Sequence, residues 1–315
     1  MNNSPAFALL LDDLAVLRAS GADAADFLHG QLTQDIAGLP PGRARLAAYC
    51  TPKGRVLATL IILRDPDNEE SLLALVKADI AAPLVKRLSM FVLRAKAKLE
   101  VSDLKVLGIS TAPKNSDSTV SLTPPANGAT WSVVKDAQGI WINAPAADAS
   151  EQRWWLITPG HDPVPASSSQ QDAWKAADIE AGLPWIETAT QDVFIPQTLN
   201  LDLIDGVNFT KGCYPGQEVV ARSHYRGTVK RRMAYGVADT TDEIPVAGTD
   251  IYDAERPESP SGRVINAAAR AGQTHLLLEV HLSDMSTAQY RLGSAEGTPI
   301  ALHPLPYAIE HIQET

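Results

Sequence analysis

The sequence predicts an α+β fold, and three observations carry this prediction. Segments with helical spacing of apolar residues and segments with strand-like alternation are mixed along the chain without a regular strand–helix–strand repeat. No glycine-rich phosphate loop is present. The last part of the chain consists of short apolar runs separated by turn residues, which is typical of a small β-barrel. With 315 residues, 45% of them apolar, the chain is long enough for two or three domains.

The first part of the chain predicts helices and strands in mixed order. Residues 20–34 (SGADAADFLHGQLTQ) have helical spacing, with aspartates near the start where a helix favours negative charge. Residues 45–64 predict a hairpin, because a Pro-Lys-Gly turn precedes the apolar run VLATLIIL. Residues 79–91 predict a second helix, and residues 93–104 (LRAKAKLEVSDL) alternate like a strand.

Two polar segments interrupt the second part of the chain. Residues 112–129 and 162–172 are rich in Pro, Ser and other turn residues, and we expect loops or crossings between domains there. The runs WSVVKD, IWINAP and RWWLITP between them predict strands. Residues 173–183 predict a helix that ends at a glycine and a proline, and the predicted barrel strands follow from residue 231 onward.

Composition excludes several classes of protein. The net charge of −10 argues against a surface built as a whole to hold nucleic acid, although a local basic patch is compatible with it. No apolar run reaches the length of a membrane span and the start does not resemble a secretory signal, so we expect a cytoplasmic protein. The two cysteines, Cys50 and Cys213, cannot form a disulfide framework or supply four metal ligands. We therefore expect free thiols and no stably bound metal.

The stretch KGCYPGQE, residues 211–218, places a thiol in an unusual setting. Two glycines bracket Cys213 and permit backbone conformations that other residues avoid. Pro215 suits the first position of a helix, and the positive end of that helix together with Lys211 would favour thiolate and lower the pKa of Cys213. A buried cysteine that packs as a small apolar residue is the alternative, and the local sequence leaves both open.

A group of cations follows the cysteine in this acidic chain. Guanidinium groups form paired hydrogen bonds with carboxylates and phosphates, so the group suits a glutamate-tailed ligand or a phosphate. A solvated face that pairs with nearby acids is the alternative. The cations are Arg222, Arg226, Lys230, Arg231 and Arg232.

The same region resembles a known protein family. The run KGCYPGQEVVAR, followed by SHYRG, closely resembles the signature of the YgfZ proteins. These are folate-binding relatives of the glycine-cleavage aminomethyltransferase that act in iron–sulfur protein maintenance and are linked to tRNA thiolation. The blocks FLHGQLTQDIAGL, LAAYCTPKGRVLATLIILR and DIEAGLPWIE, and the run FIPQTLNLDLIDGVNFTKGCYPGQE, look like further parts of the family's pattern. The resemblance extends to about Met233, and the strand-rich remainder suits the family's C-terminal barrel.

The resemblance implies three domains in a ring around a central channel, the first two interleaved in sequence. Residues 1–45 and 130–185 would form a first, folate-binding-type domain. Residues 46–129 and 186–230 would form a second α+β domain that carries the cysteine motif. Residues 231–315 would form the small C-terminal β-barrel.

The resemblance also implies a site for tetrahydrofolate or a derivative in the channel, faced by Cys213 as the catalytic thiol. In aminomethyltransferases a carboxylate at the place of Glu180 holds the pterin, whose edge offers adjacent N–H donors. A glutamate on a plain helix surface is the alternative for Glu180. The implied ligand-contacting residues are Glu180, Lys211, Gly212, Gly216, Gln217, Glu218 and Arg222.

One departure from the aminomethyltransferases bears on the activity. Those enzymes carry two adjacent aspartates in the strand after the glycine turn, and one is needed for catalysis. This chain has Ala58 and Thr59 there, and neither side chain holds a charge or a transferable proton at neutral pH. We therefore do not expect an active aminomethyltransferase.

Three functions are consistent with these observations. The first is a folate-dependent accessory factor for iron–sulfur cluster assembly or repair, which supports tRNA modification by cluster enzymes indirectly. In it Cys213 would be a nucleophile, a transient cluster ligand or a redox thiol, and Cys50 would be structural. Its partners would be iron–sulfur assembly proteins or cluster-containing clients, with no direct nucleic acid and no membrane. The alternatives are a folate-dependent aminomethyl transferase and a folate-binding regulatory module without thiol chemistry.

Overall fold

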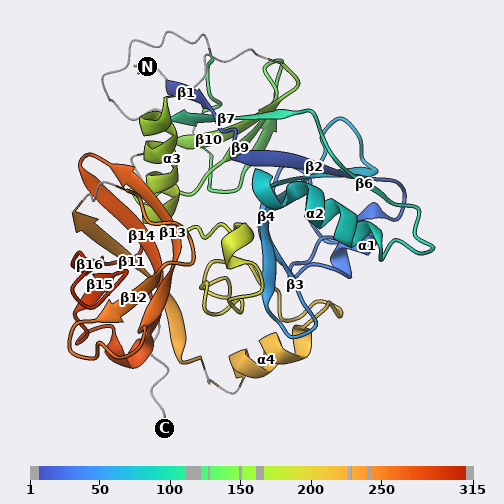
Figure 1. Cartoon of the computed structure of the whole chain (residues 1–315). Helices are drawn as coiled ribbons and strands as arrows, with labels where there is room; N and C mark the ends of the chain where they lie inside the picture. Colours follow the sequence, from blue (N-terminus) through green and yellow to red (C-terminus); the bar gives the residue numbers. More distant parts are fainter. Residues whose placement is uncertain are drawn as a thin grey trace.

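A computed structural model gives the arrangement of the chain (Figure 1). It describes residues 7–110, 122–126, 128–148, 151–160, 167–225, 227, 229–239 and 243–309. These residues form three antiparallel sheets with α-helices against them, which confirms the predicted α+β class. Most of the loop predicted over 112–129, and the first part of the segment 162–172, lie outside the described residues. No helix in the described part of the chain is long and apolar enough to cross a membrane.

The first sheet has the strand order β1-β7-β10-β9-β8 and is covered by the helix α3. Gly108 lets α3 approach closely, because a Cβ atom at this position would lie 2.7 Å from the Trp174 ring of α3. The helix starts five residues earlier than predicted, since Ser167 and Gln170 form a capping box at its N-terminus. The elements are β1 (Phe7–Leu10), β7 (Lys105–Ser110), β8 (Val133–Lys135), β9 (Ile140–Asn143), β10 (Arg153–Thr158) and α3 (Ser168–Glu180).

The second sheet has the order β3-β4-β5-β2-β6 and confirms the predicted hairpin, formed by β3 and β4. Its strand β4 is buried along nearly its whole length, as the continuous apolar run predicts. The helix α1 is shorter than predicted because Ser20 belongs to β2 and Leu32 forms a bridge to Tyr49. The elements are β2 (Leu14–Ser20), α1 (Ala24–His29), β3 (Ala44–Cys50), β4 (Val56–Arg64), β5 (Ser71–Lys77), α2 (Ala78–Ser89) and β6 (Lys98–Val101).

The strand predicted over residues 93–104 is only partly correct. β6 pairs with β2 from Lys98 to Val101, but the residues between α2 and β6 form a loop. The backbone of Lys96 explains this difference: its N–H donates to the Asp23 carboxylate at 2.6 Å, and its carbonyl accepts from the Asp23 N–H at 3.2 Å. These groups are therefore used at the start of α1 and not in a strand ladder.

The third sheet is the C-terminal barrel predicted from the turn-separated apolar runs. Its order is β15-β12-β13-β14-β11-β16, and a bridge between Arg291 and Pro299 brings its two ends together into a nearly closed barrel. An apolar cluster from its strands fills the interior. The strands are β11 (Arg231–Asp239), β12 (Asp250–Asp253), β13 (Gly262–Arg270), β14 (Gln273–His281), β15 (Tyr290–Leu292) and β16 (Ile300–His303).

The chain passes from the first sheet to the second near its start. β1 belongs to the first sheet, but β2 pairs with β5 and β6 in the second. The change therefore falls between Leu10 and Leu14. The division into interleaved domains, with its boundaries, remains a prediction.

A long coil joins α3 to the next helix, α4 (Gln217–Tyr225), and contains only the short 3-10 turn η1 (Thr188–Thr190). Figure 1 shows it in the middle of the molecule, between the second sheet and the barrel. Its backbone carbonyl at Phe194 accepts from the Val56 N–H at 2.8 Å, and Asp202 forms a buried two-bond ion pair with Arg232 of β11. The coil thus ties the second sheet to the barrel.

Candidate functional site

The cysteine loop is held against the second sheet by its lysine. The Lys211 ammonium donates to the carbonyl oxygens of His29 and Leu32, the latter at 2.8 Å, and lies 4.8 Å from the centre of the Tyr214 ring. Burial lowers the pKa of Lys211 to about 8, although the negative charges of Asp35 and Cys213 oppose that shift. Lys211 therefore acts as a brace between the end of α1 and the cysteine loop.

Two glycines let the loop pack on the β3–β4 turn. Gly216 has φ +82°, and a Cβ atom at this position would lie 2.4 Å from the carbonyl oxygen of Thr51. Gly54 of the turn has φ +73° and faces Val219 at the start of α4. Only glycine combines this backbone conformation with such close contact. Gly54 and Gly216 therefore permit close contact between two segments 162 positions apart.

The two thiols have opposite surroundings. Cys213 is exposed, whereas Cys50 at the end of β3 is buried, with 1% of its surface accessible. Burial raises the pKa of the Cys50 thiol to about 12, so this residue stays protonated at neutral pH. The buried alternative considered for Cys213 thus describes Cys50 instead.

The helix α4 begins later than the sequence predicts. Its first residue is Gln217, so Pro215 precedes the helix and Cys213 lies four positions before it. Gly212 is exposed beside Cys213, and Glu218 pairs with Arg222 along the exposed face of the helix. The helix is anchored from below by Gln197, whose amide donates to the Val220 carbonyl at 2.6 Å.

Three of the cations that follow the cysteine are engaged with acids. Arg222 pairs with Glu218, Arg231 lies 3.2 Å from Glu279, and Arg232 forms the buried pair with Asp202. Arg226 lies outside the described residues. For the three arginines, pairing with local acids is therefore the observed arrangement, and it leaves them less available to an anionic ligand.

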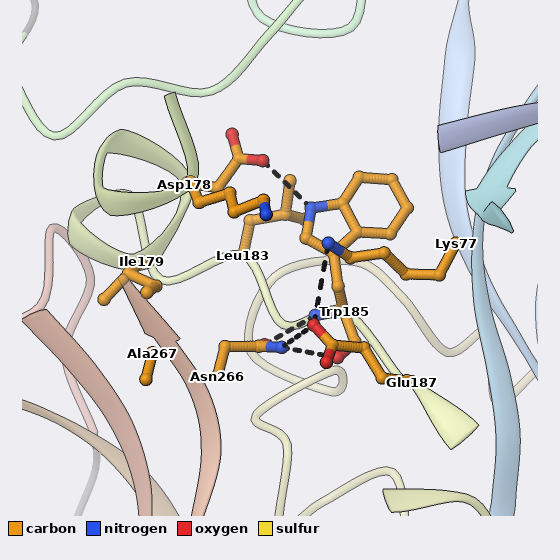
Figure 2. A pocket seen from close by; sticks show the side chains of 9 residues that line it. Lys77, Asp178, Ile179, Leu183, Trp185, Glu187, Asn266 and Ala267 are labelled. Atoms are coloured by element: carbon orange, nitrogen blue, oxygen red, sulfur yellow. Dashed lines mark hydrogen bonds and ion pairs between the residues drawn. The ribbon is translucent and has the colours of Figure 1, made fainter. Parts of the chain in front are cut away.

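A second candidate region is a small pocket lined by residues of β5, the helix α3, the central coil and the barrel strand β13 (Figure 2). The Trp185 indole N–H donates to Asp178 at 3.0 Å, and the backbone of Trp185 exchanges hydrogen bonds with the Asn266 side chain. The pocket leaves about 20 Å³ of space, roughly enough for one water molecule. It is lined by Lys77, Lys175, Asp178, Ile179, Leu183, Trp185, Glu187, Asn266 and Ala267.

The charges at this pocket are balanced in pairs. Lys77 lies 2.6 Å from Asp13 and 3.6 Å from Glu187. Burial acts to lower the pKa of Lys77, but these carboxylates outweigh it and the pKa rises. Asp178 is buried against Arg153 at 2.6 Å, and burial raises the pKa of this carboxyl. The pocket therefore contains carboxylates, an amide, an indole and two ammonium groups, with the Lys77 ammonium paired to the Glu187 carboxylate.

Glu180 contacts the barrel. Its carboxylate accepts from Arg270 of β13 and lies 3.2 Å from His275 of β14. The Tyr235 hydroxyl lies 2.8 Å from the same His275 ring nitrogen. Glu180 thus joins the end of α3 to the barrel, and its side chain, 18% exposed, is not the plain surface glutamate of the alternative.

The site residues predicted from the sequence do not form one cluster. The motif residues gather where the loop, α4 and the β3–β4 turn meet, and none of the recorded contacts within the described residues links Glu180 to them. Sequence reasoning missed the pocket residues Lys77, Trp185 and Asn266. Their positions at a strand end, in a coil and within a barrel strand gave no spacing signal, since three separate segments meet only on folding.

Proteins of known family resemble the chain over nearly its full length. Proteins named "tRNA-modifying protein YgfZ" are 31% identical in Photorhabdus laumondii subsp. laumondii over 320 residues, covering 97% of this chain and 93% of the relative, and 31% identical in Edwardsiella ictaluri over 327 residues, covering 97% and 94%. The chain belongs to the YgfZ family. The YgfZ protein of Klebsiella pneumoniae is 29% identical over 320 residues, with 97% and 94% covered. No family model matches the chain.

The YgfZ family fold of this chain is also found in a solved enzyme structure. The aminomethyltransferase T of the glycine cleavage system from Bartonella henselae superposes with a TM-score of 0.66 at 13% identity, over 96% of this chain and 86% of that one. The expected resemblance to the aminomethyltransferase fold is thus confirmed.

The two positions that depart from the aminomethyltransferase pattern have structural roles in this YgfZ-family chain. Ala58 is completely buried in β4. The Thr59 hydroxyl accepts a hydrogen bond at 3.1 Å from the backbone N–H of Ile186, in the central coil. Among the described residues, no three His, Cys, Asp or Glu side chains are grouped so that they could hold a metal ion.

Proposed function

We propose that the chain is a folate-dependent accessory factor for iron–sulfur cluster assembly or repair, with Cys213 as its functional thiol. Through cluster-containing enzymes it would support tRNA modification indirectly, in line with its relatives being named tRNA-modifying proteins. The observation that carries this proposal is the display of an exposed thiol on a loop that is braced from both sides.

The contacts of Lys211 and Gly216 hold the cysteine loop in place while the thiol stays exposed. Lys211 fixes the loop to α1, and Gly216 fixes it to the β3–β4 turn. A residue held this way keeps its position without being covered, which suits a group that must meet a partner protein. The exposed thiol can attack an electrophile, ligate a cluster during transfer or undergo oxidation, and each of these needs access from outside.

The central pocket contains the types of group that a folate would contact, although its carboxylates and the Lys77 ammonium have partners within the protein. A pterin edge presents adjacent N–H donors, which match the carboxylates of Asp178 and Glu187, and its flat ring matches the indole of Trp185. Lys77 and Lys175 suit the carboxylates of a glutamate tail. The space is smaller than a bicyclic ring, so binding requires the lining side chains to move apart. When bound, tetrahydrofolate supplies a carrier for one-carbon units.

Glu180 stays a candidate for pterin contact, although its present partners are Arg270 and His275. A ligand that used this carboxylate would have to replace the Arg270 guanidinium. The structural use of Thr59 supports the loss of aminomethyl transfer, because the position that would carry a catalytic carboxylate holds the coil instead. The proposal therefore assigns the ligand a binding role and assigns the chemistry to Cys213.

The test is complementation of a deletion strain with single variants. Cys213→Ser should lose support of cluster-enzyme activity and of the dependent tRNA modification, whereas Cys50→Ser should retain both if the protein remains folded. Thermal melting of each purified variant separates loss of the thiol from loss of the fold. Full complementation by a folded Cys213→Ser protein would favour the binding module without thiol chemistry.

A second assay separates this function from a transferase. Formation of methylenetetrahydrofolate from an aminomethyl donor should be absent for the purified chain. Turnover in this assay would support the one-carbon transferase instead, in spite of Ala58 and Thr59.

A further inference from the structure

A continuous segment of this acidic protein carries only positive charge. Residues 80–99 contain five Lys or Arg residues and neither Asp nor Glu, while the whole chain has a net charge of −10. The remainder of the chain therefore carries 22 cations against 37 acids, or −15. Because the screening length is about 8 Å at physiological salt, this local positive charge attracts an acidic partner that comes within that distance.

The same segment exposes large apolar side chains. Met90, Phe91 and Leu93 have 62%, 49% and 86% of their surface accessible. The cations Lys86, Arg87, Arg94 and Lys96 are exposed around them, and none of these four appears in an ion pair recorded for the described residues. We call these seven residues the Leu93 patch. Exposed apolar side chains are unfavourable in water, and exposed apolar patches surrounded by polar residues mark interaction sites.

The backbone under the Leu93 patch is fixed. The N–H of Phe91 donates to Leu88 at 2.9 Å, and that of Lys96 donates to Asp23 at 2.6 Å. Gly21 permits this approach, because a Cβ atom there would lie 2.2 Å from the Lys96 carbonyl oxygen. The apolar side chains are thus presented on a prearranged loop, which lowers the entropy lost on binding.

The position of the Leu93 patch relates it to the cysteine loop. Asp23, at the start of α1, holds the patch, and the carbonyl of His29, at the end of α1, holds Lys211. The helix has six residues and is therefore about 9 Å long. Figure 1 shows α1 and α2 together at the side of the second sheet, away from the barrel. A protein docked on the patch could extend along α1 toward Cys213.

We infer that the Leu93 patch is the docking surface for a partner protein whose contact face has an apolar centre and an acidic rim. Met, Phe and Arg are the residue types enriched in protein interfaces, and the charge of the patch is complementary to such a rim. An RNA or an anionic bilayer is an extended polyanion and would also face the −15 of the remaining chain. A compact protein can contact the patch without approaching the acidic remainder of the chain.

Docking at the Leu93 patch does not require the Cys213 thiol. We also infer that the docked protein is one on which Cys213 acts, and this second inference rests on the proposed function. The two are distinguishable, because docking should persist in a Cys213→Ser protein while the cluster-dependent activity is lost.

The experiment places a benzophenone amino acid at position 93 of the full chain in cells and irradiates. Val246, which is 74% exposed on the barrel side of the chain, is the matched control position. A discrete protein adduct should form from position 93 and not from position 246. The adduct should weaken with Arg94→Glu and remain with Arg43→Glu, which changes the net charge equally at another exposed arginine.

The partner identified from the adduct is then purified and its binding is measured against salt. We expect Arg94→Glu to weaken binding about tenfold or more, and the affinity to fall as salt rises. Bulk tRNA and phosphatidylcholine–phosphatidylglycerol vesicles are the comparison probes. Equal adducts from both positions, an adduct that is indifferent to Arg94→Glu, or binding of tRNA or vesicles that is lost with Arg94→Glu would each overturn the proposal.

Discussion

The central pocket and the cysteine loop show two ways of placing reactive groups in one fold. In the pocket, buried charges are matched: Asp178 with Arg153, and Lys77 with Asp13 and Glu187. In the loop, the backbone and Lys211 are fixed while the thiol remains exposed. The pocket thus neutralises its buried charges within the fold, whereas the loop leaves one reactive group open to other molecules.

The strongest test of this comparison is the loss of a buried charge. Asp178→Ala leaves the Arg153 guanidinium buried without its partner, and we expect a loss of about 3–5 kcal/mol of unfolding free energy. Asp67→Ala removes a surface partner of Lys135 and should cost at most about 1 kcal/mol. Urea unfolding of both variants checks this. Similar losses in the two would show that the pocket pairs are no more important than surface ones.

A glycine substitution tests whether the loop is truly braced. Gly216→Ala places an alanine in a left-handed backbone conformation, which should lower the unfolding free energy by about 1–2 kcal/mol. The clash of its Cβ atom with the Thr51 carbonyl should add about 1–3 kcal/mol. Gly272 has a similar φ of +79° but open space around it, so Gly272→Ala should show the first cost alone. Thermal unfolding measures both. If the two variants are equally stable, the contact between the loop and the β3–β4 turn is not tight.

The substitution at Thr59 is expected to act through the coil. Thr59→Val removes the acceptor for the Ile186 N–H and leaves that donor buried, at a cost of about 1–3 kcal/mol. Thr59→Ser keeps the hydroxyl and should lose less. Denaturant unfolding of the pair distinguishes two effects: loss of the hydrogen bond makes the Val variant the less stable, whereas loss of the buried methyl group would make the Ser variant the less stable.

The smallest expected effect is a pH dependence that comes from the brace. Lys211 has a pKa of about 8 in the folded chain and an ordinary lysine pKa of 10.5 when unfolded, so the unfolded chain binds more protons between these values. The folded state should therefore gain stability relative to Lys211→Met as pH rises from 8 to 10.5. A difference in unfolding free energy that stays constant across this range would contradict a buried Lys211.

Much of the fold followed from local sequence, but less of the site did. The β3–β4 hairpin and the barrel were predicted because turn residues and apolar runs act over short distances. The motif around Cys213 was found through its order of residues. The pocket was missed because Lys77, Trp185 and Asn266 come from segments that only tertiary packing brings together. The loop before β6 was misassigned because Asp23, some 70 residues away, binds its backbone.

The most direct test of the proposed thiol role is the alkylation rate of Cys213 with and without tetrahydrofolate, in a Cys50→Ser protein. We expect the exposed Cys213 thiol to be alkylated, and the rate to fall when tetrahydrofolate is present. A rate that tetrahydrofolate leaves unchanged would contradict a functional thiol coupled to the ligand.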